Sequence, residues 1–196
     1  IEQAKNMQIV NCWVCELPNS IELIGGENIV VKNCQLGAQP TGITCKVQEV
    51  NKLSFINNQV YPDGRENLVL DACNNCVIEG NNFKSYYNGI LVLNGNDNTV
   101  NKNIFWLTGA VQNQLLDHGD DFGIINVKGN NNMVTSNSLS CEWAYAGAVT
   151  VNAVQGTGNV FKNCFVDNLE SYRVFLVNAQ TEVSNCVSSD KVSIVE

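Results

Sequence analysis

The chain is poor in the residues on which several functional classes depend. Its 196 residues include one histidine, His118, and only 11 lysines and arginines against 19 aspartates and glutamates. The formal charge of -8 leaves no basic stripe to neutralise phosphates, which excludes nucleic acid and anionic membrane surfaces as partners. His118 has no evident nucleophile partner, so carboxylates are the only plausible catalytic groups present in number.

Long apolar runs are also missing. No stretch reaches the ~18 apolar residues of a membrane span, and the first residues, IEQAKNMQIV, lack the charged-then-apolar layout of a secretion signal. A hydrophobic content of 44% with 15% charged residues is nevertheless enough to bury a core. We therefore expect one soluble domain over residues 1–196. Because the chain starts at Ile1, already close to the first repeat, it also fits a fragment that lacks N-terminal coils.

Asparagine, by contrast, recurs at a regular interval. Segments such as VKNCQL, FINNQV and FKNCF each carry one after a short apolar run, and a polar turn precedes that run. The successive spacings are 22, 24, 24, 22, 34, 26 and 22 residues, so a single interval carries an insertion. The asparagines of this series are Asn11, Asn33, Asn57, Asn81, Asn103, Asn137, Asn163 and Asn185.

Short strands and tight turns that repeat in this way predict a right-handed parallel β-helix of about eight coils, each of roughly 22 to 26 residues. Asparagine tolerates left-handed geometry at a bend, and its inward amide bonds the equivalents above and below. An antiparallel sandwich is the competing all-β fold, but it requires hairpin pairs, whereas triplets of strands recur here. The following positions are expected to stack inside the coil: Cys12, Cys34, Asn58, Asn82, Ile104, Ser138, Cys164 and Cys186.

The nine cysteines are an odd number, and several lie in apolar, strand-like runs. This pattern favours reduced, buried thiols and a cytoplasmic location, while secretion stays open if an N-terminal segment is missing. Cys12/Cys15 and Cys73/Cys76 match a zinc-ligand spacing, but stacked coils spread donors along a line and do not close a tetrahedron. We expect no metal and no cofactor.

Among the carboxylates, Glu22 stands out. In SIELIG it lies among apolar neighbours, where desolvation would favour the protonated form that a proton donor needs. An outward-facing strand glutamate is the alternative. The run DHGDD brings Asp117, Asp120 and Asp121 together, as a cation site or, more simply, as a solvated loop. Aromatic residues that either line a sugar groove or pack in the core are Trp13, Tyr61, Tyr86, Tyr87, Trp106, Trp143 and Tyr145.

The order of several segments resembles a known enzyme family. NSIELIG, LGAQPTGIT, VYPDGRENL, FKSYYNGILVL, DDFGIINVKGNNN and QGTGNVF follow one another as in the C-terminal half of inulin fructotransferases and difructose-anhydride hydrolases, glycoside hydrolase family 91. The resemblance covers residues 9–167, and its most specific part is DDFGIINVKGNNN followed by QGTGNVF. Members of that family are right-handed parallel β-helices that assemble as trimers and work without a metal or organic cofactor.

The resemblance implies a fructan substrate and a pair of catalytic carboxylates. It places the family's glutamate on Glu22 and its aspartate eleven residues earlier, on Asn11, whose amide cannot ionise. A groove around Tyr61, Tyr86 and Tyr87 is expected to hold fructosyl units. We therefore expect a homotrimer that acts on inulin or difructose anhydride, by hydrolysis or by intramolecular fructosyl transfer.

The departure at Asn11 leaves three alternatives open. Another carboxylate such as Glu16 replaces the missing aspartate, or the chain is a non-catalytic carbohydrate-binding or assembly module that kept the scaffold, or this position was altered to trap a substrate. A polyuronate lyase is the least favoured function, because an acidic sugar needs basic partners that this chain lacks.

Overall fold

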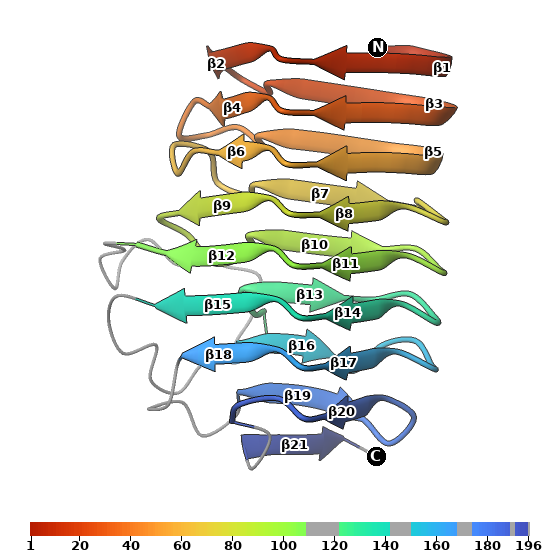
Figure 1. Cartoon of the computed structure of the whole chain (residues 1–196), viewed down its shortest axis with the longest axis vertical. Helices are drawn as coiled ribbons and strands as arrows, with labels where there is room; N and C mark the ends of the chain where they lie inside the picture. The colour runs from red at the N-terminus through yellow and green to blue at the C-terminus, as the bar shows by residue number, and fades with distance from the viewer. Residues whose placement is uncertain (109–121, 142–149, 168–173, 189–190, 196) are drawn as a thin grey trace.

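The computed structural model describes residues 1–108, 122–141, 150–167, 174–188 and 191–195. The chain winds as a right-handed parallel β-helix, with its coils stacked from the N-terminus at one end to the C-terminus at the other (Figure 1). The described residues contain no α-helix, and therefore none that could cross a membrane. Strand pairings are parallel from the first coil to the last, as in β1 with β3 and β19 with β21. The predicted fold is confirmed.

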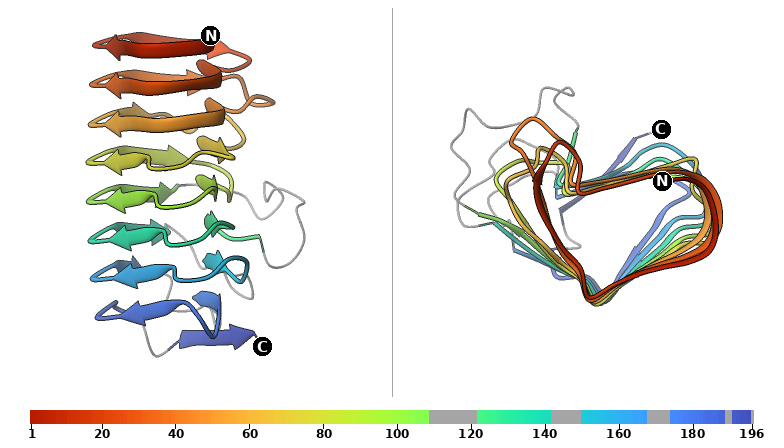
Figure 2. Two further views of the ribbon diagram at one scale, coloured as in Figure 1. Left: turned by 90° about the vertical axis from the view of Figure 1, so that its right-hand side faces the viewer. Right: turned by 90° about the horizontal axis from the view of Figure 1, so that it is seen from above.

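Three strands alternate around each coil and build three faces (Figure 2). The first and second faces form one 14-stranded sheet, because β1 (Glu2–Val10), β3 (Ile21–Lys32) and β5 (Cys45–Ile56) each run from the first face round into the second. Later coils divide this long strand in two. The first-face strands are then β7 (Leu68–Asp71), β10 (Leu91–Asn94), β13 (Ile125–Val127), β16 (Val151–Ala153), β19 (Phe175–Asn178) and β21 (Val192–Val195). The second-face strands are β8 (Val77–Glu79), β11 (Thr99–Asn101), β14 (Met133–Thr135), β17 (Val160–Lys162) and β20 (Glu182–Ser184).

The third face is a separate 7-stranded sheet, to which seven successive coils contribute one strand each. The sequence predicted about eight coils, and β19, β20 and β21 belong to the chain beyond the seventh. The strands of the third face are β2 (Trp13–Leu17), β4 (Gln35–Ala38), β6 (Gln59–Val60), β9 (Asn82–Ser85), β12 (Ile104–Leu107), β15 (Ser138–Cys141) and β18 (Phe165–Asp167).

Alternation along each strand decides which side chains enter the core. Leu23 is fully buried, whereas Glu22 beside it faces outward and is half-buried. Because parallel coils keep their register, like side chains stack on like: the ring of Phe83 lies 6.1 Å from that of Phe55 and 5.1 Å from that of Phe105. Each such side chain contributes about 1.5–3 kcal/mol when fully buried.

A column of buried amides runs along the bend between the second and third faces. The backbone N–H of Asn58 donates to Oδ1 of Asn81 at 2.8 Å, and the N–H of Asn81 donates to Oδ1 of Asn103 at 2.9 Å. Asn103 continues the column by donating to Asn137 at 2.9 Å. Each amide nitrogen also donates to a carbonyl of the preceding coil, as Asn103 Nδ2 does to Ile78 at 2.9 Å. We call this column the amide ladder.

The predicted asparagine series mixes two neighbouring positions, and this is a correction. Asn81, Asn103 and Asn137 lie in the buried ladder. The other members are exposed and sit one residue earlier, with left-handed φ between 52° and 57°: Asn11, Asn33, Asn57, Asn163 and Asn185. In the coils of Asn81, Asn103 and Asn137, the left-handed position just before the asparagine is occupied by Gly80, Lys102 and Ser136. The sequence pattern therefore finds the buried asparagine in these coils and the exposed one in the others.

The same shift explains the residues expected inside the coil. Cys34, Asn58, Cys164 and Cys186 are buried as predicted, and Cys12 packs against the core. The prediction is wrong for Asn82, Ile104 and Ser138, which begin third-face strands and face outward, because their neighbours Phe83, Phe105 and Leu139 are the buried ones.

The amide ladder should account for a large part of the stability of the central coils. In Asn103→Ala, the buried N–H of Asn81 loses its acceptor and the carbonyl of Ile78 loses a donor. We expect a loss of about 3 kcal/mol in the free energy of unfolding, measured by urea denaturation. Asn33→Gly is the control, because glycine adopts the same φ of 55° and the replaced side chain is exposed. It should change stability by less than ~0.5 kcal/mol; equal losses in both variants would contradict a ladder-specific role.

Candidate functional site

A polar groove lies on the outer side of the first face. It encloses about 190 Å³ between outward-facing side chains of β5, β7 and β10 and one residue after β13. The lining residues are Lys46, Gln48, Val69, Leu70, Asp71, Val92, Asn94 and Lys128. The groove therefore offers two ammonium groups, one carboxylate and two amides over a floor that includes valine, a combination that suits a polar ligand with several hydroxyls.

Glu22 does not line this groove but lies on β3, one coil before it, in register with Lys46, which does line it. Its Oε1 is 3.1 Å from Nζ of Lys46, and the Glu22 side chain is 40% exposed. The predicted desolvation is therefore wrong, and the outward-facing glutamate is what the structure shows. An ion-paired carboxylate on the surface is suited to accept a proton from a ligand hydroxyl.

Asp71 is the carboxylate that lines the groove itself. Asn94 Nδ2 donates to its Oδ1 at 2.7 Å, which fixes its orientation. Glu22 is in register with Lys46, whereas Asp71 is in register with Gln48, two residues further along β5. Two rungs of ~4.8 Å and two residues of ~3.3 Å therefore separate the Cα atoms of Glu22 and Asp71 by about 12 Å. No local pattern in the sequence pairs residues so far apart along the chain, because only the stacking of coils brings them to one face.

Asn11 lies away from Glu22, Asp71 and the first-face groove. It is an exposed residue with a left-handed φ of 57°, at the bend between the second and third faces. Its neighbour Val10 pairs with Lys32 at the C-terminal end of β3, whereas Glu22 lies near the N-terminal end of that 12-residue strand. The structure thus places Asn11 in the coil before Glu22, beside the opposite end of β3.

The three tyrosines expected to hold sugar units lie on another side of the coil. Tyr61 follows β6, and its hydroxyl donates to Gln35 Oε1 at 3.0 Å. Tyr86 and Tyr87 follow β9 in the next coil, and Tyr86 is exposed. All three therefore stand at the end of third-face strands, and none of these three described residues lines the first-face groove. The turns that carry them lead from the third face into the first.

Several candidates from the sequence lie outside the described residues. They are Asp117, His118, Asp120, Asp121, Trp143 and Tyr145.

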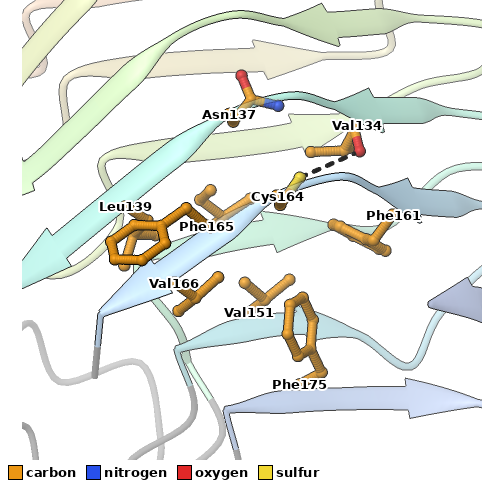
Figure 3. A pocket seen from close by; sticks show the side chains of 10 residues that line it. Val134, Asn137, Leu139, Val151, Phe161, Cys164, Phe165, Val166 and Phe175 are labelled. Atoms are coloured by element: carbon orange, nitrogen blue, oxygen red, sulfur yellow. Dashed lines mark hydrogen bonds between the residues drawn. The ribbon is translucent and has the colours of Figure 1, made fainter. Parts of the chain in front are cut away.

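A second cavity lies inside the core (Figure 3). It measures only about 10 Å³ and is lined mainly by apolar side chains, among them Val151, Phe161 and Phe175, with Cys164 at its edge. An apolar space of this size holds no ligand and at most about one water. The first-face groove is therefore the candidate site.

Eight cysteines with described side chains carry free thiols, and six of them are buried: Cys34, Cys45, Cys73, Cys76, Cys164 and Cys186, with Cys12 and Cys15 partly exposed. Burial raises the pKa of Cys73 to about 11 and that of Cys76 to about 12, against an ordinary value of 9.0. Burial also raises the pKa of Cys45. These groups therefore remain thiols at neutral pH and are poor metal ligands. Among the described residues, no three histidine, cysteine, aspartate or glutamate side chains gather around a common point.

The raised thiol pKa values predict a loss of stability at alkaline pH. Below pH 9 the thiols are protonated in both the folded and the unfolded chain; between pH 9 and about 11 they ionise only when the chain unfolds. Each then lowers the free energy of unfolding by up to ~1.4 kcal/mol per pH unit. Urea denaturation at pH 8 and pH 10 should show a drop of about 2 to 3 kcal/mol from Cys73 and Cys76.

The matched control is the double variant Cys73→Ala/Cys76→Ala. It should show a clearly smaller drop between pH 8 and pH 10, because the groups responsible have been removed. An unchanged drop in this variant would assign the pH dependence to other residues.

Solved structures similar to this one include those of DFA-IIIase from Arthrobacter chlorophenolicus A6. The complex with GF2 is 19% identical with a TM-score of 0.80, and the form without its lid, also with GF2, is 24% identical with a TM-score of 0.79. The C387A mutant in complex with DFA-III is 18% identical with a TM-score of 0.76. All of this chain is covered, but it spans only about half of theirs, 51% to 54%. No curated protein matches the chain.

These likenesses establish the fold, and at such low identity they do not confirm membership of glycoside hydrolase family 91. A family model described as "Periplasmic copper-binding protein (NosD)" matches residues 3–185. Copper prefers thiolate, thioether or imidazole ligands. The described residues do not fit a copper centre of three or more such donors, because their thiols are spread along the coils, with Cys45, Cys73 and Cys76 protonated by burial.

The family model covers nearly the whole chain, from β1 through the bend after β20. It thus includes every coil that contributes a strand to the third face, together with the first-face groove. The parallel β-helix described above is consequently the fold of a member of the NosD family, to which this chain belongs.

Proposed function

We propose that this chain binds a neutral oligosaccharide of the fructan type in the first-face groove and acts on it with Glu22 and Asp71. The observation that carries the proposal is the placement of both carboxylates on one open, polar face, each held by a neighbour: Glu22 by Lys46 at 3.1 Å and Asp71 by Asn94 at 2.7 Å. Such pairs perform acid–base chemistry on glycosidic bonds.

The lining of the groove supports a sugar ligand. Carboxylate, amide and ammonium groups alternate on neighbouring coils, so donors and acceptors for hydroxyl groups stand about one rung, ~4.8 Å, apart. Its volume of about 190 Å³ is below the ~300 Å³ of a typical enclosed ligand pocket. One or two units of a longer chain therefore fit it. The similar DFA-IIIase structures were solved with GF2 and DFA-III, which supports the choice of a fructan as substrate.

Each carboxylate has a distinct role in this proposal. Glu22, ion-paired with Lys46, accepts the proton of the attacking group, either a water or a sugar hydroxyl, and this replaces the proton-donor role expected from the sequence. Asp71 donates a proton to the leaving oxygen through Oδ2, since Oδ1 accepts from Asn94.

The test is turnover of inulin and of difructose anhydride III, followed by chromatography of the products. Glu22→Gln and Asp71→Asn should each lower turnover by about 100-fold or more, because an amide neither accepts nor donates the required proton. Glu27→Gln is the matched control: Glu27 lies on the same strand, is 39% exposed and pairs with Lys52 at 3.3 Å. It should retain full turnover.

Two further measurements define the outcome. Asn11→Asp should leave turnover unchanged, because Asn11 lies at the far end of β3 from the groove. Sugar binding by the unmodified chain without any turnover would overturn the catalytic part of the proposal and favour the carbohydrate-binding module. Loss of turnover in Glu27→Gln as well as in Glu22→Gln would show that disturbing any ion pair of β3 is enough to lower turnover, and would contradict a specific role of Glu22.

We further propose that the chain assembles as a homotrimer, as the family resemblance implies. Large apolar side chains remain exposed on the outer faces of the single chain, including Trp13, Leu17, Ile104, Met133 and Phe165. Covering them would lower the free energy of an assembly. Light scattering after size exclusion should give three times the chain mass of 21.5 kDa; a mass of 21.5 kDa at micromolar concentration would contradict the proposal.

A further inference from the structure

The amide ladder ends in thiols at the C-terminal coils. After Asn137 the next two ladder positions are Cys164 and Cys186, and both are 6% exposed. The backbone N–H of Cys164 points at Sγ of Cys186, 3.4 Å away, as the N–H groups of the asparagines point at the next Oδ1. Sγ of Cys164 lies 3.4 Å from the carbonyl of Val134 in the preceding coil (Figure 3). Each thiol thus occupies the place of an amide.

Stacking also puts the two cysteines at the same position of neighbouring coils. Lys162 pairs with Ser184, and the N–H of Val187 donates to the carbonyl of Cys164 at 3.0 Å, so the register continues through both cysteines. In-register residues of adjacent parallel strands lie ~4.8 Å apart, inside the ~4.4–6.8 Å range of Cα distances that a disulfide requires. Side chains at the same ladder position also point in the same direction.

The surroundings allow this pair to react. Cys164 borders the small apolar cavity of about 10 Å³ (Figure 3). Cys186 follows β20, the terminal strand of the second face, which has no further strand beyond it in the described part of the chain. A terminal coil opens more readily than a central one, because only one neighbour holds it. An oxidant in solution therefore reaches Cys186 more easily than it reaches Cys73 or Cys76.

We propose that Cys164 and Cys186 form an oxidation site, at which an external disulfide converts the two thiols into a bond between neighbouring coils. The thiolate of Cys186 attacks one sulfur of oxidised glutathione, and one reduced glutathione leaves. The thiolate of Cys164 then attacks the mixed disulfide, and the second reduced glutathione leaves. The two cysteines lose two electrons and two protons, and the external disulfide is reduced to two thiols.

Ionisation within the pair favours the first step. The hydrogen bond from the Cys164 thiol, together with its backbone N–H, lowers the pKa of Cys186, while the same interaction and burial raise the pKa of Cys164. The thiol in the more accessible terminal coil is thus the better nucleophile. The product would fasten the last bend to the coil before it and close a loop of 22 residues, which restricts the unfolded chain.

The experiment uses the full chain, reduced and then exposed to oxidised glutathione under native conditions. After unfolding and alkylation, mass spectrometry should show the loss of two hydrogens and two fewer alkylated cysteines out of nine. Peptide mapping should show Cys164 linked to Cys186. The midpoint of thermal unfolding should rise by several degrees in the oxidised chain and return when a reductant is added.

Cys186→Asn is the key variant, because asparagine already fills this ladder position in four coils and should preserve the fold. It should form no such link, and its unfolding midpoint should not respond to the oxidant. Cys76→Ala is the control at a central thiol and should behave like the unmodified chain. Glutathione attached to Cys12 or Cys15 without a Cys164–Cys186 link would overturn the proposal, as would an equally fast link between Cys73 and Cys76.

Discussion

The register between successive coils is the constraint on which the rest of this structure depends. A parallel β-helix has no hairpins to fix the alignment of its strands, so a slip of one residue would turn every inward side chain outward. The amide ladder prevents such a slip, because a buried asparagine can satisfy both its donor and its acceptor only when the coils are aligned. Leaving such groups unpaired costs about 1–3 kcal/mol each.

Fixed register also separates the tasks of neighbouring residues. Inward positions build stacked columns such as Phe55, Phe83 and Phe105, and the outward positions between them are free for chemistry. Glu22, Lys46 and Asp71 come from three successive coils and share one face only because each coil repeats the orientation of the last. A rigid ladder on one bend thereby holds the proposed catalytic groups on another face at fixed spacing.

Cysteine replaces asparagine at the ends of the ladder, where a thiol reproduces the same two contacts more weakly. At the N-terminal end, the backbone N–H of Cys34 donates to Oδ1 of Asn58 at 2.9 Å. At the C-terminal end, Sγ of Cys186 accepts from the backbone N–H of Cys164. The exchange costs hydrogen-bond strength, yet it places sulfur atoms on adjacent rungs. Strong amides thus hold the central coils, and oxidisable thiols occupy the last bends.

The sequence by itself determined the fold class, because period, apolar runs and turn residues all act locally. It also marked the bend between the second and third faces. It did not, however, distinguish the exposed left-handed position, occupied by Asn33, from the buried ladder position that follows it, occupied in another coil by Asn103, because both positions carry asparagine. Only the tertiary structure decided that Glu22 faces solvent beside Lys46, on the same face as the groove that contains Asp71. The physical reason is that residues on one face are neighbours across coils, at a distance along the chain that no local pattern records.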